Sequence, residues 1–105
     1  MNIRKTRGDR VVVELRGEHE AYTAAKLEQQ LDALVDAGYG IVIDLRNAQF
    51  IDSTTAGLFI AMHRRAEKRG SEFSLLLGDS TGWPVRRLLD VTGLGSLLNV
   101  ADYRH

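Results

Sequence analysis

Residues 41–57, IVIDLRNAQFIDSTTAG, join a nearly unbroken apolar run to a cluster of small polar residues. The apolar run, residues 41–45, is typical of a strand that is buried on both faces and lies at the centre of a sheet with parallel neighbours. The polar cluster, residues 52–55, ends where a helix-like apolar pattern resumes at Leu58. The sequence therefore predicts that the cluster lies at the carboxyl end of the central strand, where the second helix begins.

Helical spacing of apolar residues predicts three helices around this strand. The clearest covers residues 23–37, with Thr23 as its N-cap and Gly38 just past its end. A second helix is expected over residues 55–69, up to a glycine. A third is expected over residues 84–91, because its first residue is a proline, which suits the first helical turn.

Further strands are expected on both sides of these helices. Residues 3–6 and 11–15 form a predicted hairpin, with a tight turn at residues 8–9. Residues 73–77 and 97–100 are expected to add two more strands. The order is then β-β-α-β-α-β-α-β. This alternation predicts an α/β fold with a mixed, mostly parallel sheet and helices packed on it.

Length, charge and composition narrow the class of function. The chain of 105 residues is expected to be one domain, residues 1–105. It has no cysteine, which excludes disulfides and thiolate metal sites and fits an intracellular, cytoplasmic location. Lys+Arg and Asp+Glu both total 14, so the basic surplus expected of a nucleic-acid binder is absent. No apolar run reaches the ~18 residues of a membrane span, so membrane insertion is not expected.

The polar cluster is larger than a structural role requires. A helix N-terminus has free N–H groups and a positive dipole end, and it stabilises anions such as phosphate. One or two residues from Asp52 to Thr55 would cap the helix, but four in a row exceed what capping needs. The sequence therefore favours a functional role, with a hydroxyl as nucleophile, ligand contact or phosphoacceptor.

An enzymatic role is the weaker interpretation. A nucleophile such as Ser53 needs a base, and the histidines are His19, His63 and His105. The nucleophile-elbow pattern Gly-x-Ser-x-Gly and the glycine-rich nucleotide-binding patterns are all missing from the sequence. Three scattered histidines do not predict a metal site. Neither a catalytic residue nor a cofactor is expected.

Residues 50–58, FIDSTTAGL, resemble the signature of STAS domains, specifically of bacterial anti-sigma factor antagonists. Those proteins place an Asp-Ser-Ser/Thr-Gly-Leu-Gly segment after an apolar strand ending in Asp-Leu, which here is IVIDL. Three further stretches are similar to family patterns: LRGEHEAYTAAKL (15–27), RRAEKRG (64–70) and VRRLLDVTGL (85–94). The matches lie in the expected order. They imply the STAS fold for the chain.

The resemblance also implies a partner switch. An unmodified antagonist of this family binds an anti-sigma factor that is also a serine/threonine kinase, and binding frees a sigma factor. The kinase then phosphorylates the second hydroxyl residue after the Asp, the complex separates, and a phosphatase resets the antagonist. Carried over, the phosphoacceptor is Thr54, with Ser53 as the alternative. The implied partner-binding residues are Glu20, Asp52, Ser53, Thr54, Thr55 and Gly57.

Phosphorylation at this place suits a switch. A helix N-terminus tolerates the added charge, whereas an interface with acidic surroundings would be repelled. Asp52 is adjacent in sequence, and Glu18 and Glu20 add like charge where their loop lies nearby. Thr55 stands where the family has a glycine, which makes this loop stiffer and bulkier.

Two interpretations stay open beside the switch. STAS domains also serve as non-phosphorylated accessory subunits of lipid or solute transporters, and as scaffolds in stress-sensing assemblies. Those often lack a hydroxyl at the phosphoacceptor position, so Thr54 favours the switch. A small hydrolase using Ser53 is the least favoured. Trp83, at the start of the third helix, is expected to be partly buried in the core rather than an exposed contact.

Overall fold

Eleven helices and strands make up the described part of the chain in the computed structural model. Residues 2–6, 8–19 and 21–103 are described, with the backbone alone at residues 18, 19 and 21–23. The strands are β1 (Asn2–Lys5), β2 (Arg10–Glu14), β3 (Gly17–His19), β4 (Gly40–Asp44), β5 (Ala48–Ile51), β6 (Phe73–Gly78) and β7 (Asn99–Tyr103). The helices are α1 (Ala21–Asp36), α2 (Ser53–Lys68), α3 (Trp83–Val91) and α4 (Leu94–Leu97).

The main sheet has the strand order β1-β2-β4-β6-β7. β1 is antiparallel to β2, and every other pair is parallel. β4 lies at the centre, with Ile41 beside Val11 on one side and Phe73 on the other. The predicted mixed, mostly parallel α/β sheet and its central strand are confirmed.

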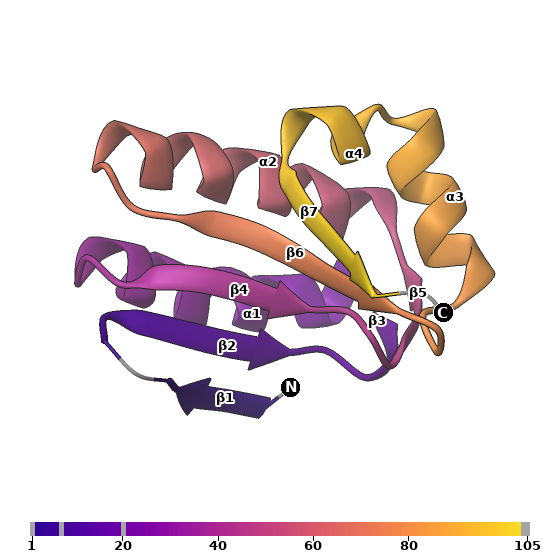
Figure 1. Ribbon diagram of the computed structural model, residues 1–105, viewed down its shortest axis with the longest axis horizontal. Coiled ribbons are helices and arrows are strands. Elements are labelled where there is room, and N and C mark those ends of the chain that lie inside the picture. Colours follow the sequence, from indigo (N-terminus) through magenta and orange to yellow (C-terminus); the bar gives the residue numbers. More distant parts are fainter. Residues whose placement is uncertain (1, 7, 20, 104–105) are drawn as a thin grey trace.

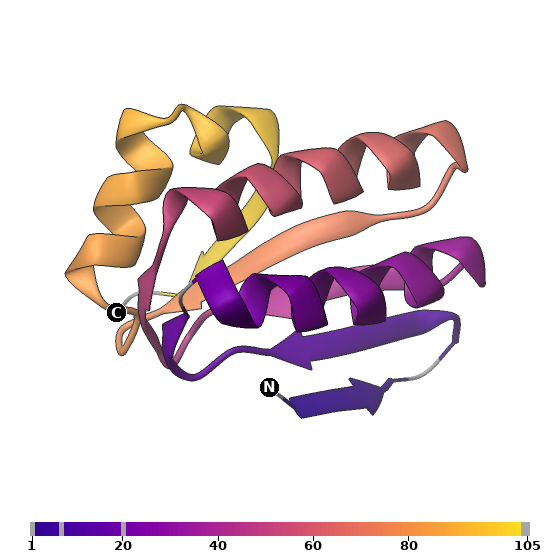
Figure 2. The ribbon, with the colours of Figure 1, turned by 180° about the vertical axis from the view of Figure 1, so that it is seen from behind.

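Helices α1 and α2 lie side by side on one face of this sheet (Figures 1 and 2). The side chains of Ile41 and Ile43 are fully buried beneath them. Val42 points to the opposite face and is only partly buried, in a shallow groove with long side chains such as Arg10 and Arg46. The prediction that this strand is buried on both faces holds only in part: on this second face Asp44 is fully buried, but Val42 is partly exposed because none of the described helices covers it (Figure 1).

Helix α1 ends as the sequence predicts. Gly38 has a φ of 87°, which glycine adopts without strain. Its N–H donates to the Val35 carbonyl at 3.0 Å, and the Tyr39 N–H donates to the Leu34 carbonyl at 3.1 Å, the pattern of a Schellman motif. The N-terminus differs from the prediction, because the helix begins at Ala21 and Thr23 lies inside it rather than at the cap.

A second, two-stranded sheet was not predicted from the sequence. β3 runs parallel to β5, so the segment before Asp52 is a separate strand rather than the end of the central one. The chain turns after β4, with the Ala48 N–H donating to the Leu45 carbonyl at 3.1 Å. Strands of three and four residues carry too short a pattern for periodicity to identify them.

The C-terminal segment also differs in detail. The last strand, predicted at residues 97–100, is β7 at Asn99–Tyr103, and the short helix α4 precedes it. Leu94 and Leu98 are buried at both ends of this helical turn. Their spacing of four residues fits one helical turn, so the apolar residues here mark a helix end and not the start of a strand.

The loop between β6 and α3 is fixed against the loop between β4 and β5. The Thr81 hydroxyl donates to the Leu45 carbonyl at 2.9 Å and accepts from the Gly78 N–H at 3.0 Å. The Gly82 N–H donates to the Ala48 carbonyl at 2.8 Å. A Cβ on Gly82 would lie 2.3 Å from the Gln49 carbonyl oxygen, so a residue without a side chain is required here. These contacts hold the start of α3 against β5.

The substitution Gly82→Ala tests this close approach. Its added methyl would collide with backbone, so we expect unfolding free energy to fall by about 1–3 kcal/mol. Urea denaturation of the variant and wild type measures the loss. Gly95→Ala is the matched control, because a Cβ on Gly95 meets nothing within 4 Å. Equal stability of the two variants would contradict the packing described here.

Candidate functional site

The polar cluster forms the N-terminus of α2. Asp52 is the N-cap, with φ −96° and ψ 174°, and its carboxylate accepts a hydrogen bond from the Thr55 N–H at 2.9 Å. The helix begins at Ser53, two residues earlier than predicted, so Ser53 and Thr54 stand in its first turn. This turn lies at the end of the molecule toward which β4 and β6 run (Figure 1). The prediction that the cluster directly follows the central strand is wrong, because β5 lies between β4 and Asp52, but the cluster does lie at the start of the second helix as predicted.

Helix geometry divides the cluster into presented and buried residues. Ser53 and Thr54 are exposed, and Asp52 is partly buried. Thr55 is fully buried, and its hydroxyl has no hydrogen-bond partner among the described residues. Its side chain faces the core, so it does not crowd the neighbouring hydroxyls. It also offers no surface to a partner, and we remove it from the predicted contact residues for this reason.

Thr54 borders a groove between α1 and α2. The groove has a volume of about 390 Å³, and small side chains make up most of its lining. A Cβ on Gly57 would meet nothing within 4 Å, so the glycine leaves this surface open without being required by packing. Thr54 and Gly57, both predicted to contact a partner, thus line the same groove. The remaining lining residues are Ala24, Ala25, Glu28, Leu58 and Ala61.

A second groove opens on the other side of the cluster, between β5 and α3. Asp52 and Ser53 line it together with Trp83, and its volume is about 330 Å³. Trp83 is 67% exposed, so the expected burial of this side chain in the core is wrong. The reason is helical phase: Val85 and Leu89 face the core, and Trp83 points away from it. That spacing was readable in the sequence.

The segment before α1 also reaches this edge. His19 in β3 pairs with Ile51, directly before Asp52, so the backbone of residues 17–19 lies beside the cluster as expected. The predicted contact Glu20 lies outside the described residues. His63 is ten residues along α2 from Ser53, about 15 Å by the helical rise, and is too far to act as its base.

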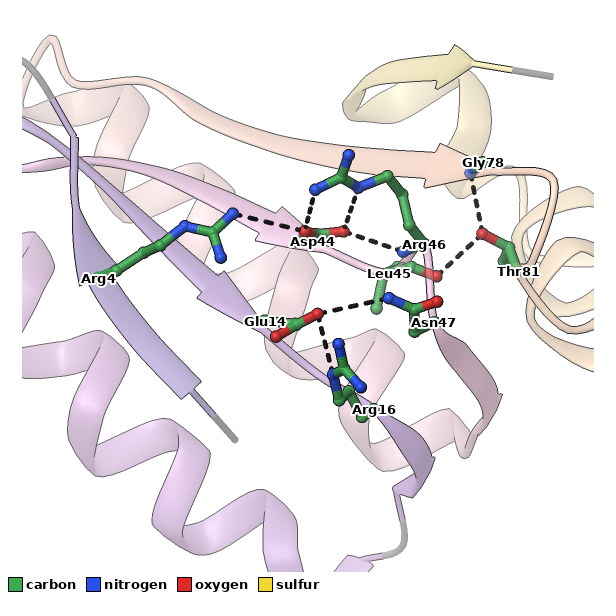
Figure 3. A network of polar contacts seen from close by, with 9 residues as sticks. All are labelled: Arg4, Glu14, Arg16, Asp44, Leu45, Arg46, Asn47, Gly78 and Thr81. Atoms are coloured by element: carbon green, nitrogen blue, oxygen red, sulfur yellow. Dashed lines mark hydrogen bonds and ion pairs between the residues drawn. The ribbon is translucent and has the colours of Figure 1, made fainter. Parts of the chain in front are cut away.

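The open face of the sheet carries a network of charges near the same edge (Figure 3). Asp44 is fully buried and accepts two hydrogen bonds from the Arg46 guanidinium, at 3.0 and 2.8 Å. Arg4 lies 3.9 Å from the same carboxylate, and Arg16 lies 3.1 Å from Glu14. Because these arginines are already paired with carboxylates, the network is a structural element and not a free anion site.

The described residues were compared with the patterns of metal-ligand clusters and of membrane-spanning helices. Within these ranges there is no group of three or more His, Cys, Asp or Glu side chains arranged to hold a metal ion. None of the described helices is both long and apolar enough to cross a bilayer.

Comparisons with known proteins identify the family. A family model described as "Mlab, STAS domain" matches residues 3–101. The anti-sigma-B factor antagonist of Staphylococcus aureus is 32% identical over 105 residues, covering 97% of this chain and 94% of the relative. The chain belongs to the STAS-domain family of anti-sigma factor antagonists. Antagonists of this family are binding regulators rather than enzymes, which agrees with the sequence interpretation.

Solved structures of antagonists share this STAS fold. One from Mycobacterium paratuberculosis is 25% identical with a TM-score of 0.80, covering 94% of this chain and 81% of that one. The Bacillus antagonist SpoIIAA in its unphosphorylated form is 22% identical with a TM-score of 0.79, over 95% of this chain and 86% of that one. Its phosphorylated form is 20% identical with a TM-score of 0.74, over 95% and 89%. The fold prediction is thereby confirmed.

The buried carboxylate in the STAS sheet gives a pH-dependent stability. Burial raises the pKa of Asp44, but the hydrogen bonds from Arg46 outweigh burial and hold it below its ordinary value of 3.8. Because the pKa of Asp44 is lower in the folded than in the unfolded protein, its ionised carboxylate stabilises the fold at pH values above the unfolded pKa. This stabilisation is lost as the pH falls through the folded pKa. We expect Asp44→Asn to lower unfolding free energy at pH 7 by about 1–3 kcal/mol. In urea denaturation, the difference in unfolding free energy between variant and wild type should become smaller below pH 3.8. A difference that does not change with pH would contradict this prediction.

Asp52 is expected to act both as a helix cap and as a charged contact, and two substitutions separate these roles. Asp52→Ala removes the cap acceptor and should lower unfolding free energy by about 0.5–2 kcal/mol. Asp52→Asn keeps a side-chain oxygen for the Thr55 N–H and should stay near wild type in stability. Thermal unfolding measures both. If both variants weaken the affinity for a partner equally, the partner contacts the negative charge of Asp52. If Asp52→Asn keeps the wild-type affinity, binding depends on the helix cap alone.

Proposed function

We propose that this chain antagonises an anti-sigma factor and that phosphorylation of Thr54 controls its release. The observation that carries the proposal is the exposed hydroxyl of Thr54 in the first turn of α2, at the edge of an open groove. The partner class follows from relatives named as anti-sigma factor antagonists. The proposed kinase is the anti-sigma factor itself, and a phosphatase restores the unmodified state.

Several features support tolerance of a phosphate at Thr54. The first turn of α2 contains no acidic residue, and its amide groups and dipole favour an anion. Thr54 is exposed, so a phosphate would extend into solvent rather than into the core. SpoIIAA has been solved in both unphosphorylated and phosphorylated forms, and each matches this fold over 95% of the chain. A phosphate on that protein is thus compatible with the fold.

The same phosphate would oppose a bound protein. It adds a charge of about −1.5 to −2 and three strong acceptor oxygens. Glu28 lines the groove beside Thr54, and Asp52 lies at the helix cap, so the added charge joins two carboxylates at this edge. Desolvating such a cluster under a partner costs several kcal/mol unless the partner supplies matching cations. Phosphorylation therefore acts on binding and leaves the fold in place.

Thr54 is preferred to Ser53 as the acceptor for a geometric reason as well as by resemblance. Ser53 borders the groove of β5 and α3, whereas Thr54 borders the groove that contains Glu28. The groove beside Ser53 contains Arg87 as well as Asp52, so a phosphate there would have a cation nearby, whereas one on Thr54 would meet the carboxylate of Glu28 with no cation among the described residues that line the groove.

The substitution Thr54→Glu tests the switch. We expect it to weaken binding to the anti-sigma factor by about 100-fold, or ~2.7 kcal/mol, because it places a carboxylate beside Glu28. Wild type and variant serve as baits in lysate of the source cell, with captured proteins identified by mass spectrometry. Affinity for the captured anti-sigma factor is then measured with purified proteins. Thr54→Ser is the control that keeps a hydroxyl and should still bind.

Three outcomes would count against the proposal. If Thr54→Glu binds the anti-sigma factor as tightly as the wild type does, control of binding by phosphorylation at Thr54 is contradicted. If the captured kinase and ATP place the phosphate on Ser53, the acceptor is Ser53 and not Thr54. Capture of a transporter ATPase or a scaffold by both baits would instead favour an accessory STAS subunit.

A further inference from the structure

An exposed apolar face on α3 adjoins the proposed switch. Trp83, Arg87 and Val91 stand at spacings of four residues and therefore lie on one side of the helix. Trp83 is 67% exposed and Val91 68% exposed, and Phe50 on β5 is 38% exposed beside them. All four residues line the groove of about 330 Å³ that also contains Asp52 and Ser53.

The core does not account for this face. Val85 and Leu89, on the opposite side of the helix, are 0% and 4% exposed and anchor α3 to the fold. Trp83 instead presents its ring to solvent, with the Arg87 guanidinium 5.2 Å from the ring centroid. Tryptophan and arginine are the residue types most enriched where binding energy concentrates in protein interfaces.

We propose that this groove is a second contact for the anti-sigma factor, taking an apolar side chain of that protein next to a carboxylate. The inference rests on the proposed function, because it names a further part of the same interface. The apolar side chain would fill the space between Trp83, Val91 and Phe50. The carboxylate would pair with Arg87.

Two observations favour this occupant. Arg87 is exposed and makes no ion pair with an acid in the described residues, so its charge is available to a carboxylate. The groove is also continuous with the switch, because Asp52 and Ser53 form part of its wall. A stable interface covers about 800 Å² on each partner, far more than one helical turn offers. A protein that covers Thr54 must extend onto neighbouring surface, and the groove of Trp83 lies directly beside it.

The single tryptophan of the chain makes the proposal measurable without any mutation of this protein. The free protein should show the red-shifted fluorescence of an exposed indole. Adding the purified anti-sigma factor, with its own tryptophans replaced by phenylalanine, should shift this emission to the blue and reduce its quenching by acrylamide. A dilution series of the antagonist alone provides a control. A concentration-dependent blue shift without partner would show that a second copy covers the groove, which overturns the proposal.

Substitutions then test the energetic role. We expect Trp83→Ala and Arg87→Glu each to weaken binding of the anti-sigma factor by at least about tenfold. Tyr103→Ala is the matched control, since Tyr103 is an aromatic residue 63% exposed on β7, and it should bind within about twofold of wild type. Thermal unfolding should place all three variants close to wild type, because the changed side chains are exposed.

The outcomes separate this inference from the switch. If Thr54→Glu abolishes binding and Trp83→Ala leaves it intact, the proposed contact at the groove is contradicted and the phosphorylation switch is supported. If Trp83→Ala weakens binding and Thr54→Glu leaves it intact, the contact at the groove is supported and the phosphorylation switch is contradicted. Failure of the wild type to bind any anti-sigma factor would overturn both.

Discussion

The docking of the loop before α3 onto the loop after β4 is the constraint on which the groove between β5 and α3 depends. Thr81 joins two strands of the sheet through one hydroxyl, and Gly82 lets the backbone touch β5 where any side chain would collide. This contact fixes the first turn of α3 beside the first turn of α2. Without it, Trp83 and Asp52 would belong to separate surfaces, and only the groove between α1 and α2 would remain at the site.

The first turn of α2 combines a structural and a functional role without conflict, because helical phase separates them. Asp52 and Thr55 form the cap hydrogen bond, with Thr55 buried and Asp52 partly buried, and Ser53 and Thr54 between them are exposed. Changes to the outward hydroxyls leave the cap hydrogen bond untouched. The proposed phosphorylation of Thr54 depends on this separation, because it lets the outward hydroxyl change while the cap stays in place.

The sequence predicts the fold well wherever one pattern extends over a full element. Residues 41–45 locate the central strand, and Gly38 marks the end of α1, because a short apolar run and a left-handed glycine are local signals. The pairing of β3 with β5 is a tertiary contact between segments too short to carry a pattern. The prediction for Trp83 fails because a large aromatic residue is usually at least partly buried, whereas the phase set by Val85 and Leu89 points this one outward.

The two proposals place attraction and release on different elements. The face of Trp83 on α3 offers aromatic and aliphatic area, and phosphorylation of Thr54 leaves that area unchanged. Repulsion enters only through α2, at the opposite groove, where Glu28 already supplies a like charge. A partner held by both contacts is therefore weakened by a nearly constant electrostatic penalty, whatever affinity the α3 face contributes. Strengthening the α3 contact would slow release, so the exposed area of this groove sets how completely the phosphate can switch the complex off.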